Sequence, residues 1–481
     1  MKRFWLVLLS LGLVLAFSAS AMAVDVKFSG SFYAAGMYLD RTTLNSDRFM
    51  TAAAVNAVPG DATHNYTPGI PAQYQAAGTS TAFYYQRLRL QTDFIVSPGL
   101  KLVTRFDALE RIWGGTRSVA GTPDAESIGT RAENENIAFD LAYVEYASPI
   151  GLFSVGYQID NVWGTKFGDN GDGPTTGAIK YILPIGPVIL GGVIYKEADL
   201  SKSAVQTSSL QADRDSDKYV AFGIYNITKD INVGLLYSYS RVATYKAAYM
   251  TTSPYAGAMI YVNTLQPYVK AKFGPLYVES EFWYVWGRYP GLEDPAYGGD
   301  VQLESIMGYV NAVVDLGPVY FGGTAAYISG DDKGTSEKKE GGLVGGGMDW
   351  NPCLIMFNQD LTYWAGSPNG YNGTNTQSVD GHGMTNAWFG QGKVGVRPIP
   401  PLDINASLSY ARAESRPLNT ITDKKAYGWE VDVAGTYKIT NNLAYMLGVG
   451  YLFAGDYYKG YSDAPSPKDD FLVINKLTLT F

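Results

Sequence analysis

The stretch at residues 468–481 places the strongest constraint on what this chain can fold into. Apolar side chains recur at alternate positions there, and Lys and Thr side chains lie between them. Successive side chains of a β-strand point to opposite faces, so the pattern predicts a strand with one apolar face. Such a strand tends to aggregate at an open sheet edge, whereas a closed β-barrel pairs its last strand with its first. The apolar positions are Phe471, Val473, Leu477, Leu479 and Phe481.

The first 23 residues predict a cleaved export signal. Two basic residues precede an apolar run from Phe4 to Phe17, which only Ser10 and Gly12 interrupt, and small residues follow up to Ala23. The run is too short for a membrane span, although a retained anchor helix is the alternative. Cleavage leaves one expected domain, residues 24–481, and takes the net charge from −8 to −10. A nucleic-acid partner is therefore not expected.

Cysteine and histidine are scarce, which excludes several classes of site. With Cys353 as the one cysteine, the chain has no intrachain disulfide framework, c-type haem attachment or cysteine-rich zinc site. Barrel hydrolases need a histidine beside a serine or a carboxylate. His64 and His382 both fall in polar loop sequence without obvious partners. We therefore predict no metal site, no cofactor and no enzymatic activity.

Short turns alternate with long polar connections along the whole chain. The number of short turns and long connections together predicts a transmembrane antiparallel up-and-down β-barrel of about twenty strands, with 18–22 as the range. The alternative is a β-propeller, but each repeat holds two long strands rather than four short ones. Turns rich in Pro, Gly or Asn are expected at residues 97–99, 148–151, 184–187, 228–230, 273–275, 316–318, 351–352, 398–401 and 440–442.

Aromatic residues near the expected strand ends indicate the environment of the barrel. Alternation itself, as in Leu402–Tyr410, would also suit a soluble sandwich whose core the aromatics cap. Aromatics on the apolar face at strand ends are typical of girdles at the lipid headgroups. The predicted girdle residues are Tyr410, Tyr427, Trp429, Tyr437, Tyr445, Tyr451 and Phe453.

Both ends of the expected barrel resemble the Gram-negative outer-membrane porin superfamily. Val26–Gly30, leading to Tyr33, is similar to the first strand of many porins, and Phe471–Phe481 resembles their carboxy-terminal membrane-insertion signal. The large porins abundant in metal-respiring bacteria are one type within this superfamily that the start of the chain resembles. The resemblance implies a cell outer-membrane location and contact with lipid and lipopolysaccharide. It also implies insertion by the barrel-assembly machinery and a homotrimer as one assembly.

Charged residues spaced two apart in the expected strands predict pore-lining rows. An arginine that faces lipid near the midplane costs roughly 2–4 kcal/mol, so these side chains are expected to face the lumen. Such rows either bias ion passage or form a salt-bridged wall that keeps the lumen wet. The predicted residues are Arg87, Arg89, Asp93, Lys101, Arg105, Asp107, Lys270, Lys272, Glu279, Glu281, Lys393 and Arg397.

A glycine- and aspartate-rich run at residues 168–173 falls in the third long loop. Asp169 and Asp172 make this loop a candidate for the pore constriction. Oxygen ligands between tight glycines also suit calcium, but the run lacks the spacing and closing Glu of an EF-hand. An ordinary turn is the favoured interpretation.

A charged inner face without catalytic residues predicts passive diffusion of ions and small hydrophilic solutes. One alternative is the structural sheath of a porin–cytochrome electron conduit, whose haems would belong to a partner. Another is a surface adhesin or anchor that displays the long first loop, residues 41–79.

Overall fold

The computed structural model describes most of the chain. The predicted export signal, His64, His382 and Asp172 lie outside the described part. The described residues are 24–45, 80–115, 137–160, 162–171, 173–199, 215–244, 259–289, 300–332, 337–371, 383–416, 423–459 and 466–481.

The described residues form nineteen β-strands with little helix. The first ten strands are β1 (Asp25–Leu39), β2 (Thr81–Ser97), β3 (Leu100–Ile112), β4 (Ala138–Ser148), β5 (Gly151–Ile159), β6 (Thr175–Ile185), β7 (Val188–Ala198), β8 (Ser216–Thr228), β9 (Ile231–Val242) and β10 (Ile260–Phe273). The remaining elements are β11 (Leu276–Tyr289), β12 (Val301–Asp315), β13 (Val319–Ile328), β14 (Lys338–Lys339), helix α3 (Gln359–Ala365), β15 (Ala387–Ile399), β16 (Leu402–Ala413), β17 (Ala426–Lys438), β18 (Leu443–Ala454), the 3-10 helix η5 (Asp456–Lys459) and β19 (Asp470–Thr480).

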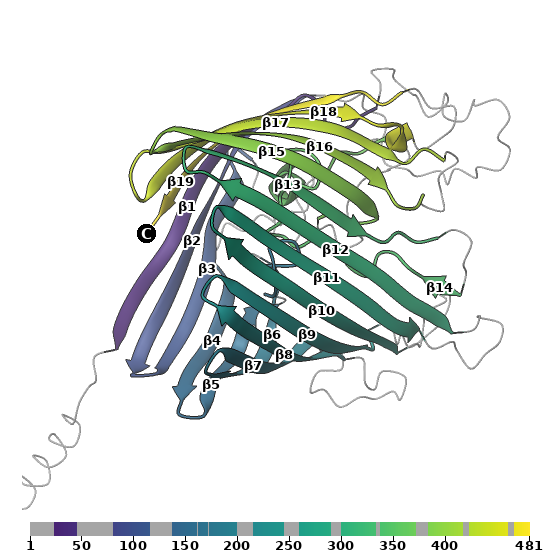
Figure 1. The fold of residues 1–481 in the computed structure, drawn as a ribbon. Helices are drawn as coiled ribbons and strands as arrows, with labels where there is room; N and C mark the ends of the chain where they lie inside the picture. Colours follow the sequence, from purple (N-terminus) through teal and green to yellow (C-terminus); the bar gives the residue numbers. More distant parts are fainter. Residues whose placement is uncertain are drawn as a thin grey trace, which may run out of the picture.

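Every strand except β14 belongs to one closed antiparallel barrel of eighteen strands (Figure 1). Neighbours in sequence are neighbours in the sheet, and β19 pairs with β1 over nine residues to close it. The Gly30 amide donates to the Phe481 carbonyl at 2.8 Å, and the Phe481 amide donates back at 3.1 Å. The two-residue strand β14 pairs in parallel with β12. The prediction of an antiparallel barrel with 18–22 strands is confirmed.

One predicted turn was wrong, and it accounts for the lower strand number. Residues 351–352 do not join two wall strands, since β13 pairs directly with β15. The chain between these strands instead turns into the barrel, where it forms α3. We call residues 345–371 the infolded segment. Asn-Pro and Gly composition marks a chain reversal but does not show whether strands flank it.

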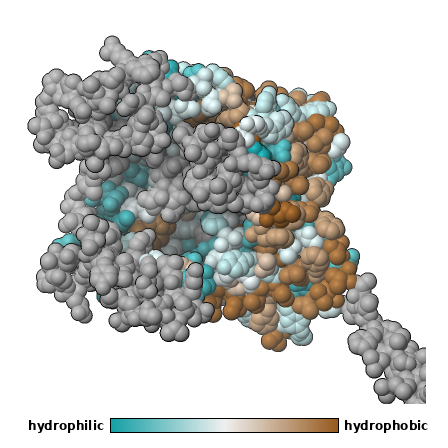
Figure 2. Space-filling model, turned by 180° about the vertical axis from the view of Figure 1, so that it is seen from behind, coloured by the Kyte–Doolittle hydropathy of each residue, from teal (hydrophilic) through white to brown (hydrophobic). Residues whose placement is uncertain are grey.

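The outer wall of the barrel is apolar. Figure 2 shows hydrophobic residues gathered over the strands. Large apolar side chains such as Phe28, Val155 and Leu408 are about half exposed there. A contiguous apolar surface of this kind is expected where strands contact lipid. Among the described residues, no helix has the length and apolar character needed to cross a membrane.

The aromatic residues predicted for the girdle lie on the outer face, with one exception. Trp429 is 49% exposed and packs on Tyr410 with ring centroids 4.7 Å apart. Tyr427 was predicted on this face, but it is only 1% exposed and points inward. The pairing of β16 with β17 shifts register beside Gly428, whose φ is +131°. An extra residue of this kind moves the next side chain to the opposite face.

The barrel holds a hydrophobic core on the inner side of its wall. Inward residues of β1 and β19, including Met37 and Ile474, pack against Trp364 and Ile355 of the infolded segment. These two strands therefore have apolar residues on both faces: one face belongs to the exposed outer wall, and the other packs against the infolded segment. Burying large apolar side chains contributes roughly 1.5–3 kcal/mol each.

Candidate functional site

The infolded segment is attached to the barrel wall by hydrogen bonds from its own backbone. The Glu430 carboxylate on β17 accepts from the amides of Ile355 and Met356, at 2.7 Å each. On β15, Gln391 Nε2 donates to the Pro352 carbonyl at 2.6 Å. Charge-assisted bonds of this type are stronger than neutral ones, so Glu430 is a principal anchor of the segment.

Helix α3 presents a carboxylate to a neighbouring part of the wall, formed by β19 and β2. The Asn358 side chain caps it by accepting from the Leu361 amide at 2.8 Å, as expected at a helix start. Asp360 in the first turn then accepts from the Tyr85 hydroxyl at 3.2 Å and pairs with Lys476 at 3.3 Å. The helix is therefore held against β2 and β19 by polar contacts as well as by packing.

A cavity of about 760 Å³ lies between the infolded segment and the wall. Strands β1–β4 and β16–β19 supply the wall side, and residues 173–175 border it as well. The charged and polar lining includes Arg87, Arg89, Asp107, Glu110, Asp140, Asn358, Asp360, Asn405, Ser407, Asp432 and Lys476. Charged and polar side chains of the wall and of the infolded segment face each other across this cavity, and we take it as the candidate site.

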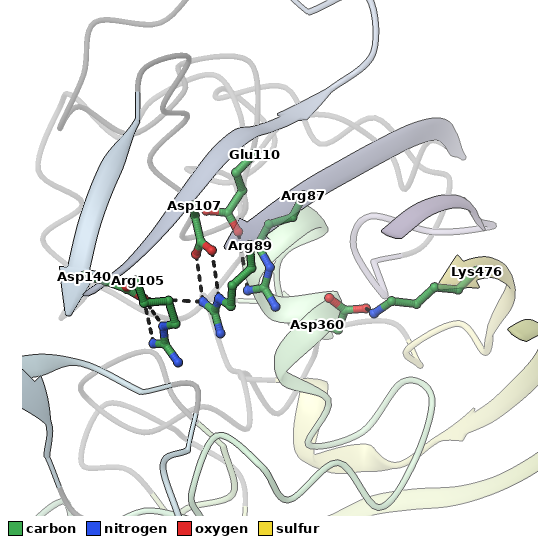
Figure 3. A network of polar contacts seen from close by, with 8 residues as sticks. All are labelled: Arg87, Arg89, Arg105, Asp107, Glu110, Asp140, Asp360 and Lys476. Atoms are coloured by element: carbon green, nitrogen blue, oxygen red, sulfur yellow. Dashed lines mark hydrogen bonds and ion pairs between the residues drawn. The ribbon is translucent and has the colours of Figure 1, made fainter. Parts of the chain in front are cut away.

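The wall side of the cavity carries charges of both signs in paired positions (Figure 3). Arg89 makes a bidentate contact with Asp107, at 2.8 and 2.7 Å. Arg105 pairs with Asp140 at 2.6 Å, and Arg89 also lies 3.7 Å from Asp140. In Figure 3 these side chains lie side by side across β2, β3 and β4. Cross-strand register explains the pairing, because Arg89 is directly opposite Asp107.

A β-bulge adds one more carboxylate to this wall. Between the pairs Gln86–Arg111 and Leu88–Ala108, β3 has one extra residue, and Leu109 adopts a φ of +49°. The extra residue leaves Leu109 exposed on the outer face and turns Glu110 inward, 3.7 Å from Arg87. Strict alternation would place Glu110 on the outer face, which is why the sequence did not identify it.

Asp93 and Lys101 lie on the same inner wall, closer to the turn that joins β2 and β3. Lys101 pairs with Asp93 at 3.4 Å and with Glu145 of β4 at 3.1 Å. Arg87, Arg89, Asp93, Lys101, Arg105 and Asp107 are thus brought together on one wall. Their role in ion passage stays a prediction.

The other predicted charges lie elsewhere on the barrel. Lys270 is opposite Glu279 in the pairing of β10 with β11, and Glu279 accepts from the Tyr309 hydroxyl at 2.9 Å. Lys393 donates to Asn311 Oδ1 at 3.1 Å. Two further residues lie at the turn end: Lys272 is exposed, and Arg397 contacts Asp315 and Asp403 at 3.0 Å each. None of these side chains borders the cavity.

Glu281 attaches the described part of the third long loop to the wall. Its carboxylate accepts from the amide and hydroxyl of Thr165, at 2.7 and 2.6 Å, and from the Trp283 indole. The Gly347 amide donates to the Phe167 carbonyl at 2.6 Å, so this loop also contacts the infolded segment. The predicted constriction loop therefore enters the lumen, but it shares that position with a segment that the sequence did not reveal.

Asp169 lies where these two loops meet. The Asp349 amide donates to the Asp169 carbonyl at 3.3 Å. Burial first, and then the neighbouring Asp349 carboxylate, raise the pKa of Asp169 to about 6. The Asp169 carboxylate therefore holds its proton to a higher pH than an ordinary aspartate does.

Sequence reasoning missed the infolded segment and the carboxylates that hold it. The signals were present in the sequence. Asn358 and Gly366 bracket α3 as cap residues, and inward positions of β1 and β19 are apolar where a water-filled lumen would require polar ones. The predicted insertion residues Phe471, Val473, Leu477 and Leu479 lie on alternate positions of the last strand, and Phe481, which directly follows that strand, is 50% exposed. Their role in insertion stays a prediction.

Solved structures match the chain over nearly its full length, although no protein-family model and no curated protein matches the sequence. OccAB1 of Acinetobacter baumannii aligns at a TM-score of 0.50 and 10% identity, over 96% of this chain and 99% of its own. OpdK of Pseudomonas aeruginosa aligns at 0.47 and 12%, over 95% and 99%. At such identities the likeness concerns the fold alone. This chain has the fold of a large Gram-negative outer-membrane porin.

Proposed function

We propose that this protein is an outer-membrane channel through which ions and small hydrophilic solutes diffuse passively. The observation that supports this is the charged cavity between the infolded segment and the inner wall. A barrel of this strand number encloses space that inward side chains alone do not fill. The infolded segment reduces that space to a passage lined by arginine, lysine, aspartate and glutamate.

The lining suits polar solutes rather than apolar ones. Arg87, Arg89 and Lys476 alternate with carboxylates within a few ångströms, so charge of either sign finds a complementary group in transit. Rings and rows of charge at a narrow point determine which ions pass. Because carboxylates of both the wall and α3 face the cavity, we expect a mild preference for cations.

The interior of the barrel argues against the electron-conduit alternative. A sheath for a cytochrome needs a lumen wide enough for a protein partner, and here α3 and the residues before it pack on the inner wall. The proposed outer-membrane location, lipid and lipopolysaccharide contacts and homotrimer rest on the exposed apolar wall and the porin fold. They remain proposals.

Reconstitution in a planar bilayer tests the channel function. The purified, folded protein is expected to give discrete conductance steps. A variant in which residues 348–366 are replaced by a short Gly-Ser linker is expected to give larger steps, because the narrowing is removed. Heat-modifiable migration on a gel checks that both proteins are folded. A folded protein that never opens a conductance contradicts the proposal.

A further inference from the structure

Three side chains with metal-binding atoms meet behind the cavity, between the infolded segment and β17. Cys353 comes from the infolded segment, and Glu430 and Asp432 lie two residues apart on β17, so both point inward. One ligand atom from each lies within 4.8 Å of the others. The three residues are 3%, 0% and 5% exposed, respectively.

The charge at this cluster is unbalanced. Neither Glu430 nor Asp432 forms an ion pair with any residue that the structure describes. Glu430 accepts from two backbone amides, and Asp432 Oδ2 accepts from the Ser407 hydroxyl at 3.3 Å. Asp432 Oδ1 is buried with no hydrogen-bond partner among the described residues. Two adjacent buried carboxylates are costly without a positive charge, which either a shared proton or a cation supplies.

The space beside the unpartnered oxygen is kept open by a glycine. A Cβ at Gly450, which is opposite Asp432 in the pairing of β17 with β18, would lie 2.8 Å from Asp432 Oδ1. Cys353 and Asp432 also line the 760 Å³ cavity, so an ion can reach the cluster from the lumen. The cluster therefore has three metal-binding side chains, a carboxylate oxygen without a hydrogen-bond partner, and access from the cavity.

We propose that Cys353, Glu430 and Asp432 bind a divalent transition-metal ion of the zinc class. Zinc takes thiolate sulfur at about 2.3 Å and carboxylate oxygen at about 2.0–2.2 Å, usually with four ligands. The three ligand atoms, which lie within 4.8 Å of one another, need to move only slightly closer to meet these distances. A water molecule from the lumen supplies the fourth ligand. Calcium and magnesium prefer oxygen ligands alone, so the sulfur disfavours them.

Such an ion would join the infolded segment to the wall. One ligand belongs to the segment and two belong to β17, so the ion adds a bond across the same contact that Glu430 already makes to Ile355 and Met356. Hydrogen bonds from these amides would orient the Glu430 carboxylate, as outer groups do around metal ligands. The site does not depend on what passes through the channel.

Cobalt(II) titration of the folded, chelator-treated protein tests the proposal. A cobalt–thiolate bond gives a charge-transfer absorption in the near ultraviolet, and Cys353 is the one cysteine of the chain, so the band is assigned without ambiguity. We expect saturation at one ion per chain. Cys353→Ser should abolish the band, and Glu430→Gln or Asp432→Asn should weaken binding by at least about tenfold. Asp403→Asn, which alters a carboxylate of β16 paired with Arg397, is the matched control and should bind as the wild type does.

A second measurement uses the wild-type protein and therefore does not depend on whether the variants fold. Zinc should slow maleimide labelling of Cys353, and a chelator should restore the rate. Absence of both the band and the protection in folded protein overturns the proposal and leaves a shared proton as the source of charge balance. Equal affinity in wild type and Asp432→Asn overturns it as well.

Discussion

Neutralising Arg87 and Arg89 together is expected to make the channel distinctly more selective for cations. The two guanidinium groups border the cavity beside Asp107, Glu110 and Asp140. In the Arg87→Gln, Arg89→Gln variant these carboxylates stay, so the net charge at the narrowing becomes more negative by two. The opposing charges come from β3 and β4 and do not move with the substitution.

The size of the effect follows from Coulomb's law with screening. At about 8 Å and the dielectric constant of water, each lost charge changes a monovalent ion's energy by roughly 0.5 kcal/mol. At physiological salt the screening length is about 8 Å, which reduces the combined change to roughly 0.4 kcal/mol. The energy of a cation falls by as much as the energy of an anion rises, so the ratio of cation to anion permeability should rise about fourfold. At 10 mM salt the screening length is about 30 Å, and the expected rise is roughly fifteenfold.

Reversal potentials in a salt gradient measure this ratio directly. Wild type and the double variant are compared at both salt concentrations in planar bilayers. Arg397→Gln is the matched control, because Arg397 is also paired with carboxylates but lies away from the cavity, at the turn end. Equal reversal potentials for wild type and a folded double variant would refute the reasoning. The arginines would then be only a structural part of the wall.

Three further outcomes are expected. Glu281→Gln should loosen the third long loop and increase single-channel noise, because an amide has one acceptor oxygen for the donors of Thr165 and Trp283. Glu279→Gln is the control and should not increase the noise, since the partners of Glu279 belong to the wall: Tyr277, Tyr309 and Asn311. Equal noise in both variants would contradict this. Protonation of Asp169 should stabilise the contact between the two loops, since its pKa rises from an ordinary 3.8 to about 6. That stabilisation is fully present below pH about 4 and is lost as pH rises through about 6. Closures of the single channel should therefore become more frequent as pH rises over this range. Asp169→Asn should abolish this pH dependence of the closures. Phe481→Ala should lower the yield of heat-modifiable barrel in outer-membrane fractions if the predicted insertion signal is used, whereas an unchanged yield would exclude that role.

The strand pattern was predictable because it depends on local chemistry. Side chains two apart share a face, so Leu477 and Leu479 indicate the outer side and Arg87 and Arg89 the inner side without knowledge of any partner strand. Tight turns depend on a few residues of Pro, Gly or Asn. Consecutive strands of a meander pair with each other, so the order of the barrel followed once the turns were assigned.

The pairing of charges across the wall was only partly predictable. Arg89 and Asp107 were expected on one face, and the register places them directly opposite each other. Glu110 and Tyr427 were not expected inside, since each depends on a bulge. A bulge changes the face of a side chain through one backbone conformation, and alternation in the sequence does not record it.

By itself, then, the sequence determined the class of fold, the outward-facing and inward-facing sides of most strands, and the charged row of β2 and β3. The tertiary structure decided that residues 345–371 pack against the inner wall of the barrel. Residues 345–371 fold inward because Glu430, Gln391 and Tyr85, which are distant in sequence, provide acceptors, donors and an aromatic surface for them. Those contacts are made by strands distant in sequence, and the cap residues of α3 do not specify them.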